Sequence, residues 1–392
     1  MSKKAVLAFS GGLDTSFCVL WLKDKGYEVI TVCVDTGGVD KDKVKAISKK
    51  ALQLGAKKHY TVSAEKDIFE NIVAYLVKSG GLYQDIYPQL CADRYVIVEK
   101  CVEIALREKT NIIAHGCTAM GNDQVRFDVS IKALGNYEIV APIREIQNTV
   151  KGNIREYEIK YLKTRGFETQ QLHRKYSVNQ NVLGVTISGS EIDSNNEPAE
   201  DVFVLTKSKS SGTKYIRMGF KGGLPVSLND KKMSGIDILK MLNKIVGAYG
   251  IGRFIYTGDC IIGIKGRIAF ECPGLYALAV AHKALEDATL SKEQNQFKRI
   301  IGQKWAHLVY SGLYYEPLRK DLEKFIESNQ KFVSGSVTLK LRPNSLLPVK
   351  YSSHYLIKEK GTVYAQTSTW KPQEAEGFIK LFGLSTILSA KR

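Results

Sequence analysis

The first third of the chain alternates short apolar runs with helical patterns, and this alternation limits the possible folds more than any other feature of the sequence. We expect strands at residues 4–9, 28–35, 59–62, 111–115 and 138–141, and helices at residues 15–25, 41–54, 68–78, 93–108, 122–134 and 153–165. Apolar strands separated by helices are typical of a parallel, doubly wound α/β sheet with right-handed crossovers. Ligands of such sheets bind beyond the carboxyl ends of the strands. The loops after Phe9, Asp35 and His115 are therefore expected to converge on one site.

The pattern changes after residue 165, where strands and long helices no longer alternate regularly. We expect strands at residues 201–205, 214–220, 260–270, 332–341 and 363–366, helical stretches at 275–290 and 292–328, and a last helix at 373–381. A chain of 392 residues suits two or three domains. The predicted division is an α/β domain at residues 1–165, an α+β domain at 166–365 and a tail at 366–392. The polar stretch 188–200 indicates either a loop beside a site or a surface excursion.

Composition and charge narrow the classes of function. The first apolar run ends at Ser10, so it is too short for a signal peptide or a membrane span, and we expect a cytoplasmic protein. Seven cysteines form no C-x-x-C pair and are interpreted as reduced core residues. A formal charge of +17 favours anionic partners such as nucleotides or carboxylates. Nucleic-acid binding is not expected, because the sequence has no Arg-rich tail and no basic-aromatic stripe.

A glycine-rich segment joins the first expected strand to the first helix. Residues 10–16 read Ser-Gly-Gly-Leu-Asp-Thr-Ser, which places glycines and hydroxyl groups at a helix N-terminus. Glycines allow backbone N–H groups to approach phosphate oxygens, and the helix dipole favours anions there. The spacing fits neither a Walker A loop nor a dinucleotide fingerprint. A simpler interpretation is a Gly-Gly turn in which Asp14 or Thr15 is the helix N-cap.

A second polar segment, residues 114–128, follows the strand at 111–115 and leads into another helix. It brings Thr118, Asn122, Asp123 and Arg126 to the carboxyl end of a strand. Asp and Asn side chains can hold an amine, and Thr and Arg can hold carboxylates, so the cluster suits amino-acid substrates. The alternative is structural: Asn122 or Asp123 caps the helix, and Arg126 pairs with Asp128.

Both segments resemble known motifs. The first loop resembles the S-G-G-x-D-[ST] loop of the ATP pyrophosphatases, the PP-loop enzymes, which cleave ATP between the α and β phosphates. The second resembles the H-G-x-T-x-x-G-N-D-Q-V-R-F segment of argininosuccinate synthases. Further similarity to that family occurs at residues 176–181, 250–253, 263–265, 270–271 and 376–381. The resemblance therefore covers nearly the full chain.

The resemblance implies an ATP-dependent ligase that joins citrulline to aspartate through a citrullyl-AMP intermediate, with Mg²⁺ on the leaving pyrophosphate. It implies a nucleotide-binding domain, a synthetase domain and a C-terminal oligomerisation helix, in a homotetramer. The residues implied to bind ATP are Ala8, Phe9, Ser10, Gly11, Gly12, Leu13, Asp14, Thr15, Ser16, His115 and Gly116. Aspartate is implied to contact Thr118, Asn122 and Asp123, and citrulline to contact Tyr87, Asn122, Arg126, Ser177 and Thr186. The implied catalytic residues are Asp123, Asn122 and Arg126, and the metal ligands stay open.

The sequence departs from the family pattern at the acceptor side. Gly258-Asp259 stands where the family has V-E-N, and Phe270 stands where it has Tyr. Both positions belong to the citrulline site in the family, so an Nα-acylated citrulline is an alternative acceptor. Asp259, Asp93 and Glu191 are the candidate carboxylates that could instead restore the charge of the site. A tRNA-modifying PP-loop enzyme and a non-catalytic nucleotide-binding protein are the remaining alternatives.

Overall fold

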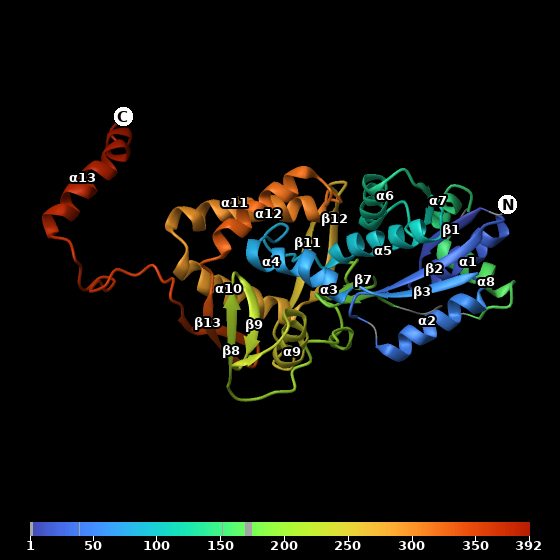
Figure 1. Cartoon of the computed structure of the whole chain (residues 1–392), viewed down its shortest axis with the longest axis horizontal. Helices are drawn as coiled ribbons and strands as arrows, with labels where there is room; N and C mark the ends of the chain where they lie inside the picture. The colour runs from blue at the N-terminus through green and yellow to red at the C-terminus, as the bar shows by residue number, and fades with distance from the viewer. Residues whose placement is uncertain (1–2, 39, 151, 169–174) are drawn as a thin grey trace.

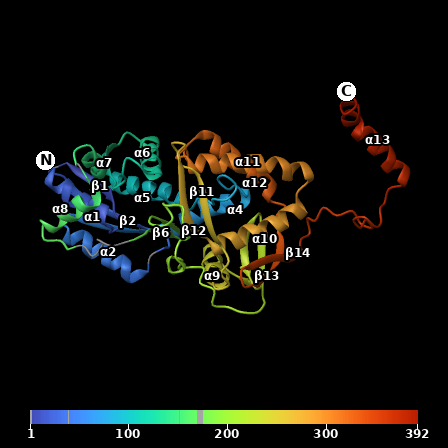
Figure 2. The same ribbon diagram turned by 180° about the vertical axis from the view of Figure 1, so that it is seen from behind.

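The computed structural model describes residues 3–38, 40–150, 152–168 and 175–392. Figure 1 shows an elongated molecule, with the N-terminal sheet at one end, a mixed α and β region in the middle, and a single helix, α13, projecting at the other end. The view from behind in Figure 2 shows the same order. No helix in these ranges is both long and apolar enough to cross a membrane.

The N-terminal sheet is parallel throughout. Its five strands lie in the order β3-β2-β1-β4-β5. Their bounds are β1 (Lys4–Ala8), β2 (Glu28–Asp35), β3 (Lys58–Ser63), β4 (Ile112–Ala114) and β5 (Glu138–Val140). The chain builds outward from β1 to β3 and then returns to the other side of β1, so the winding reverses between β1 and β4. This switch point is where ligands bind in open α/β sheets.

Helices cover both faces of this sheet. One face packs with α1 (Leu13–Asp24), α2 (Lys41–Gln53), α7 (Pro142–Gln147) and α8 (Ile154–Lys163), and the other with α5 (Asp93–Arg107) and α6 (Asn122–Leu134). Neighbouring residues of β1 serve opposite faces: Leu7 packs with Phe17 of α1, whereas Val6 packs in the cluster that contains Phe127 of α6. A strand buried on both faces needs an apolar run and not an alternating one. The predicted doubly wound fold is confirmed.

The middle region contains two antiparallel sheets. The first has the order β10-β9-β8-β13-β14, with bounds β8 (Lys214–Lys221), β9 (Leu224–Leu228), β10 (Lys231–Lys232), β13 (Gly335–Arg342) and β14 (Ser345–Ser352). The second has the order β11-β12-β7-β6, with bounds β6 (Ser177–Asn181), β7 (Gly184–Ser188), β11 (Arg253–Asp259) and β12 (Lys265–Glu271).

The helices of this region are α9 (Gly235–Gly247), α10 (Pro273–Thr289), α11 (Lys292–Tyr310) and α12 (Pro317–Gln330). Their largest buried side chain is Trp305. A segment of the first third also enters this core, through α3 (Glu65–Ile68), the π-helical turn Phe69–Val73, α4 (Ala74–Ser79) and the short turn Leu90–Ala92. This segment links the parallel sheet to the second region.

Several expected elements differ from the structure. The strand expected at 201–205 is a 3₁₀ turn, Glu200–Val202, because the buried carboxylate of Glu271 accepts the backbone N–H groups of Val204, Leu205 and Thr206. The strand expected at 363–366 is only an isolated bridge between Val363 and Thr367.

Two further expectations were too long. The strand expected at 260–270 begins with a turn and is a strand only from Lys265, in β12; β11, which pairs with it across the turn, was not expected. The helical stretch expected at 292–328 is interrupted by Gly312, at φ +84°, and by Pro317, which starts α12. Left-handed backbone and proline both end a helix, because glycine adopts that conformation without strain and proline lacks an N–H group.

The last helix, α13 (Pro372–Ser389), is longer than the expected 373–381 and has no buried residue. It stands apart from the rest of the molecule at the end of an extended connection (Figure 1). Its exposed apolar side chains are Phe378, Ile379, Leu381, Phe382, Leu384, Ile387 and Leu388. A single chain leaves these side chains in water, and an exposed apolar surface of this kind marks an interaction site.

Candidate active site

A cavity of about 320 Å³ lies at the switch point of the parallel sheet. The glycine-rich loop forms one wall, and the segment after β4 forms another. The predicted ATP residues that line it are Ala8, Phe9, Ser10, Gly12, Leu13, Asp14, Thr15, His115 and Gly116. Gly11 and Ser16 do not line it. The Ser16 hydroxyl is buried and donates to the Gly12 carbonyl at 2.6 Å, so it fastens the loop.

The N-terminus of α1 opens on this cavity without a side-chain cap. Gly12 is the N-cap residue, and no side chain accepts the first-turn amides, so the alternative in which Asp14 or Thr15 caps the helix is wrong. Uncapped N–H groups and the positive end of the helix dipole favour a bound anion. Gly11 has φ +74°, a left-handed conformation that suits glycine and that turns the chain toward the helix. The loop therefore has the geometry of a phosphate site.

His115 closes the far wall of the nucleotide cavity. Its Nε2 atom lies 2.7 Å from Oδ1 of Asp128, and the N–H of Cys117 donates to its Nδ1 atom at 3.2 Å. Asp128 also accepts from Arg144 at 2.8 Å. Burial by itself raises the pKa of Asp128, but the hydrogen bonds and charges of His115 and Arg144 outweigh it and lower that pKa. The pairing fixes both the imidazole ring and the start of the second polar segment.

Asp14 lies on the first turn of α1 and faces a buried carboxyl group on α8. Glu158 is 1% exposed, and its Oε1 atom has no hydrogen-bond partner among the described residues. Burial, and then the charge of Asp14, raise the pKa of Glu158 to about 8. Burial also raises the pKa of Asp14. A buried carboxyl group beside another negative charge is harder to ionise, so Glu158 holds its proton more tightly than an exposed glutamate does.

A second cavity, of about 680 Å³, adjoins the first. All the residues predicted to bind aspartate or citrulline line it: Tyr87, Thr118, Asn122, Asp123, Arg126, Ser177 and Thr186. The two cavities share wall residues Asp14, Arg94, Gly116, Cys117 and Asn179. Segments from the parallel sheet, from β6 and β7, and from the β11–β12 hairpin thus line two adjoining cavities that have five wall residues in common.

Asp123 sits between two guanidinium groups. Its Oδ1 atom accepts from Nη1 of Arg126 at 2.8 Å, and its Oδ2 atom accepts from Nε of Arg94 at 3.1 Å. Burial alone raises the pKa of Asp123, but the charges of Arg94 and Arg126 bring it below its usual value. Arg126 also donates twice to the carbonyl oxygen of Tyr310, at 2.9 and 3.2 Å. The expected structural alternative, an Arg126–Asp128 pair, is not formed, because Asp128 is held by His115 and Arg144.

Asn122 has a partner for each end of its amide. Its Nδ2 group donates to the Tyr310 hydroxyl at 3.1 Å, and its Oδ1 atom accepts the N–H of Ile261 at 3.0 Å. Ile261 belongs to the turn between β11 and β12, so Asn122 ties this hairpin to the N-terminus of α6. Gly121, and neither Asn122 nor Asp123, is the N-cap residue of α6, and it makes no side-chain cap.

The sequence interpretation missed several wall residues. Arg94 was missed although it starts α5 beside Asp93, with which it pairs at 2.7 Å. Tyr256 and Tyr310 come from distant segments, and nothing in their local sequence distinguishes them. Three cysteines interpreted as core residues, Cys91, Cys117 and Cys260, also line the acceptor cavity. Burial raises the pKa of Cys91 and of Cys117, which keeps both thiols protonated.

The two positions that depart from the family pattern are closed by packing. A side chain at Gly258 would collide with Gln84 and Tyr256, because a Cβ atom there would lie 2.1 Å from Gln84 Oε1 and 2.4 Å from the Tyr256 hydroxyl. Phe270 is fully buried and packs edge-to-face on Tyr87, at a ring distance of 5.5 Å. Position 258 therefore presents no carboxylate to the cavity, and position 270 presents no phenol hydroxyl.

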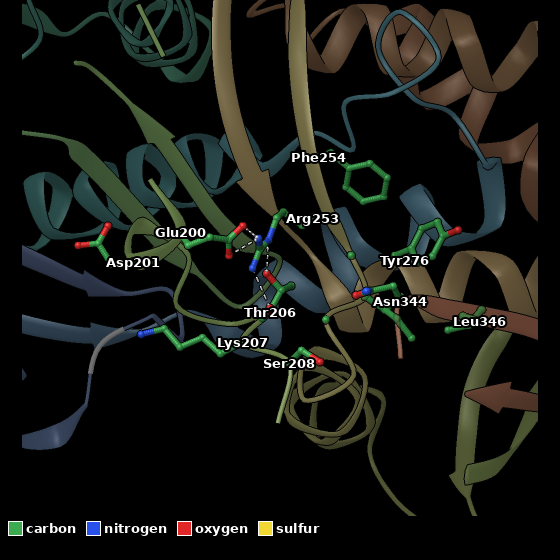
Figure 3. Close-up of a pocket in the computed structure, with 13 residues that line it drawn as sticks. Glu200, Asp201, Thr206, Lys207, Ser208, Arg253, Phe254, Tyr276, Asn344 and Leu346 are labelled. Carbon is green, nitrogen blue, oxygen red and sulfur yellow. Dashed lines mark hydrogen bonds and ion pairs between the residues drawn. The ribbon is translucent and has the colours of Figure 1, made fainter. Parts of the chain in front are cut away.

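A larger cavity, of about 840 Å³, lies at the start of β11, and Figure 3 shows the residues that line it. None of the predicted site residues is among them. Arg253 crosses it to Glu200, at 2.8 Å, and donates to the hydroxyl and carbonyl oxygens of Thr206 at 3.0 and 2.9 Å. These bonds hold the 200–206 loop against the second sheet. The chemistry predicted from the two loops is therefore assigned to the adjoining cavities and not to this one.

Comparison with known proteins identifies the family of the chain. Residues 4–168 match the sequence family described as the arginosuccinate synthase N-terminal HUP domain, and residues 176–389 match the arginosuccinate synthase C-terminal domain. The chain is 49% identical over 393 residues to an argininosuccinate synthase of Xanthomonas campestris pv. campestris, with 100% of this chain and 99% of that protein covered.

Other relatives extend the likeness to distant organisms. An argininosuccinate synthase of Xylella fastidiosa is 48% identical, with 99% of this chain and 98% of that protein covered. One of Pyrococcus furiosus is 42% identical, with 98% of this chain and 94% of that protein covered. Since both family regions match and the likeness runs the length of each relative, the chain belongs to the argininosuccinate synthase family.

Proposed function

We propose that this protein ligates citrulline and aspartate at the expense of ATP, with AMP and pyrophosphate as the other products. The observation that carries the proposal is that a phosphate-binding loop and an amino-acid cluster line adjoining cavities that share wall residues. Family membership supplies the substrates, since the relatives are argininosuccinate synthases. A non-catalytic nucleotide-binding protein would not need the amino-acid cluster that adjoins the loop.

The first half-reaction takes place where the cavities meet. The ureido oxygen of citrulline bonds to the α phosphorus, and the bond from that phosphorus to the β-phosphate oxygen breaks. The loop residues Ser10, Gly12 and Thr15 hold the phosphates with hydroxyl groups and uncapped amides. The amides are fixed before the reaction starts, so they stabilise developing charge without reorganisation. No enzyme nucleophile is needed, because positioning supplies the main catalytic effect.

In the second half-reaction the amine of aspartate attacks the ureido carbon, and the bond from that carbon to the AMP oxygen breaks. Thr118, Asn122 and Asp123 line the wall assigned to aspartate, and Tyr87, Arg126, Ser177 and Thr186 line the wall assigned to citrulline, with Asn122 between them. A lowered pKa makes Asp123 a weak base, so it orients the amine by charge and hydrogen bonding. Asn122 acts mainly through the hairpin that it holds.

Mg²⁺ is expected to enter with the nucleotide. Magnesium usually keeps several waters and binds through phosphates and one or two carboxylates, so a complete protein cage is not required. Asp14 is the carboxylate that lines both cavities, and it is the residue that would hold the metal. The ion would neutralise charge on the departing pyrophosphate.

We also infer a homo-oligomer, with a homotetramer as the expected form. The support is the isolated helix α13, whose apolar side chains have no cover within the described chain. A second copy of the chain is the partner that is always present at matching concentration. Closed homo-oligomers are the commonest assemblies of soluble proteins.

The activity is tested by measuring pyrophosphate release from ATP. Citrulline plus aspartate should give sustained release, and the products should include AMP and argininosuccinate in equal amounts. Either amino acid alone should give little release, and bulk tRNA should give none. Release that requires tRNA, or that does not require aspartate, would contradict the proposal.

A further inference from the structure

The cavity of about 680 Å³, here called the acceptor cavity, must balance the charge of a bound citrulline. A free α-amino acid carries an ammonium group, and a partly buried ammonium requires a carboxylate or other acceptors. Position 258 is glycine, with the side chains of Gln84 and Tyr256 packed against it, and position 270 is a buried phenylalanine, so neither supplies a carboxylate. The required carboxylate must therefore come from another segment of the chain, or the acceptor must carry no ammonium.

The three carboxylates suggested by the sequence are all committed elsewhere. Asp259 pairs with Lys265 and accepts from Gln84 at 2.6 Å, and it does not line the acceptor cavity. Asp93 is 3% exposed and is held by Arg94. Glu191 pairs with Lys175 and accepts from the Tyr176 hydroxyl at 2.5 Å, also outside the cavity. These candidates are set aside.

Three carboxylates line the acceptor cavity within the described ranges: Asp14, Asp123 and Asp193. Asp14 belongs to the phosphate loop and faces Glu158. Asp123 is shared by two guanidinium groups. Asp193 forms no ion pair in the described chain, and the hydrogen bond recorded for it is the one that its Oδ1 atom accepts from the Gly189 N–H at 3.1 Å. Asp14 is assigned to the nucleotide side, where it would hold Mg²⁺, and Asp123 is already paired, so Asp193 is the lining carboxylate left to bind an ammonium group.

The loop that carries Asp193 is held in place by Arg267 of β12. Nη1 of Arg267 donates to the carbonyl oxygens of Ile192 at 3.2 Å and of Asn196 at 2.7 Å, on either side of Asp193. Arg267 itself lines the acceptor cavity. The irregular stretch 188–200 is thus fixed against the site, and it is not a free surface excursion.

We propose that Asp193 binds the α-ammonium group of the acceptor, and that this residue selects free citrulline over Nα-acylated citrulline. The inference rests on the proposed ligase function and names a specificity residue for it. An ammonium donates hydrogen bonds to a carboxylate and gains from its charge, whereas an Nα-acyl group is neutral and bulkier. Asp193 therefore replaces, from a different segment, the charge that Gly258 cannot provide.

The test is the steady-state rate of pyrophosphate release with citrulline varied at saturating ATP and aspartate. Asp193→Asn should raise KM for citrulline about 10- to 100-fold with kcat nearly unchanged, as expected for the loss of one charge-assisted hydrogen bond. The ratio of kcat/KM for citrulline to that for Nα-acetylcitrulline should fall by a similar factor. The matched control is Glu191→Gln, which changes a carboxylate of the same loop outside the cavity and should leave both values unchanged.

The possible results separate cleanly. Unchanged KM in Asp193→Asn, or a loss confined to kcat, would overturn the assignment. A wild-type preference for Nα-acetyl- or Nα-succinylcitrulline would also overturn it, while leaving the ligase function intact. No release with any of these acceptors would instead refute the proposed function. Asp193→Ser, checked by thermal unfolding like the first variant, must show the same increase in KM.

Discussion

Asp123 and Asp128 lie on the same helix, α6, but their surroundings give them different tasks. Asp128 joins His115 to Arg144 and so fixes the wall of the nucleotide cavity. Asp123 turns to Arg94 and Arg126 at the mouth of the acceptor cavity. The pKa of each is lowered by cationic or hydrogen-bonding neighbours, so both are ionised at neutral pH. The two carboxylates therefore differ in their partners and not in their charge: Asp128 holds the nucleotide-cavity wall, and Asp123 faces the acceptor cavity.

Asp123→Asn is expected to separate the two half-reactions. Only the second half-reaction uses the amine of aspartate, so formation of argininosuccinate should fall about 100-fold. Citrulline-dependent exchange of pyrophosphate into ATP, measured without aspartate, should fall much less. Asp67→Asn is the control, because Asp67 has the same 37% side-chain exposure and also pairs with a cation, Lys100. Equal losses in exchange and in ligation would show that Asp123 does not hold the amine.

Gly12→Val is expected to abolish ATP-dependent turnover while the protein stays folded. A Cβ atom at Gly12 would meet only Ser10 Oγ, at 3.4 Å, which is ordinary contact, so the backbone tolerates it. The added side chain would occupy the space that the phosphates need. Gly11→Val should instead destabilise the fold. Gly11 has φ +74°, which strains any other residue, and a Cβ atom added there would lie only 3.0 Å from Cγ1 of Ile47. Thermal unfolding and ATP titration of both variants check the contrast, and normal turnover in Gly12→Val would mean that the loop is only a turn.

The sequence predicted which residues line the two cavities better than it predicted the hydrogen bonds that these residues form. The two loops could be assigned because short motifs place backbone amides and polar side chains together within a few residues. The partners of Asn122, which are Tyr310 and the turn at Ile261, lie far away in the sequence. Asp193 carries no local signal either, because only the bonds of Arg267 to its loop bring it to the cavity. Contacts between distant segments could not be read from one sequence.

At the scale of elements, the contact between α1 and α8 buries the carboxyl group of Glu158 beside Asp14 of the phosphate loop. Burial and Asp14 raise the pKa of Glu158 from its ordinary value of 4.5 to about 8. The folded state therefore binds this proton more tightly than the unfolded chain. Its contribution to stability is fully present below pH 4.5 and is lost as the pH rises through about 8.

Glu158→Gln is expected to remove this dependence on pH. Glutamine is neutral, so the variant should gain in free energy of unfolding relative to the wild type, by at most about 1.4 kcal/mol per pH unit between pH 5 and about 8. Urea unfolding at several pH values measures the slope. Glu156→Gln, which changes an exposed carboxylate of the same helix, should keep the wild-type slope. Parallel slopes in Glu158→Gln and the wild type would show that Glu158 is ionised in the folded protein.

Every strand of the parallel sheet was expected. The central strands β1 and β2 are buried on both faces and leave a clear apolar run, whereas the edge strand β3 has no buried residue. The hairpin of β6 and β7 and the helix α9 were not expected. Strand β6 has four exposed residues and a polar sequence, so pairing with β7 and not side-chain burial defines it. The strand predicted at 201–205 is absent, because the backbone N–H groups of Leu205 and Thr206 donate to the buried carboxylate of Glu271 and not to a neighbouring strand.

At the scale of the whole molecule, the apolar side chains of α13 are not covered by any other part of the described chain. Phe378 and Phe382 stack at a ring distance of 5.1 Å and are 64% and 73% exposed. Replacing both by glutamate should place charges on the apolar face of the helix and abolish association with other copies. Sedimentation velocity should then show a monomer where the wild type shows an oligomer. Since α13 covers nothing in its own chain, the thermal stability of the isolated subunit should not change.

The control is Gln373→Glu together with Lys380→Glu, which adds negative charge to the same helix without removing apolar side chains. This variant should remain associated. An unchanged oligomer in the double phenylalanine variant would show that α13 does not mediate assembly. A monomeric wild type would contradict the inferred homo-oligomer directly.

The common wall of the two cavities has a consequence for the fate of the activated intermediate. The residues that line both spaces are Asp14, Arg94, Gly116, Cys117 and Asn179, so in the proposed reaction the adenylate would form and react beside the same wall. It need not dissociate or pass through bulk water between the two steps. Hydrolysis then competes poorly with the aspartate amine, and one ATP should be spent for each bond made. The number of ATP molecules consumed per argininosuccinate formed thus depends on how closely the two cavities adjoin.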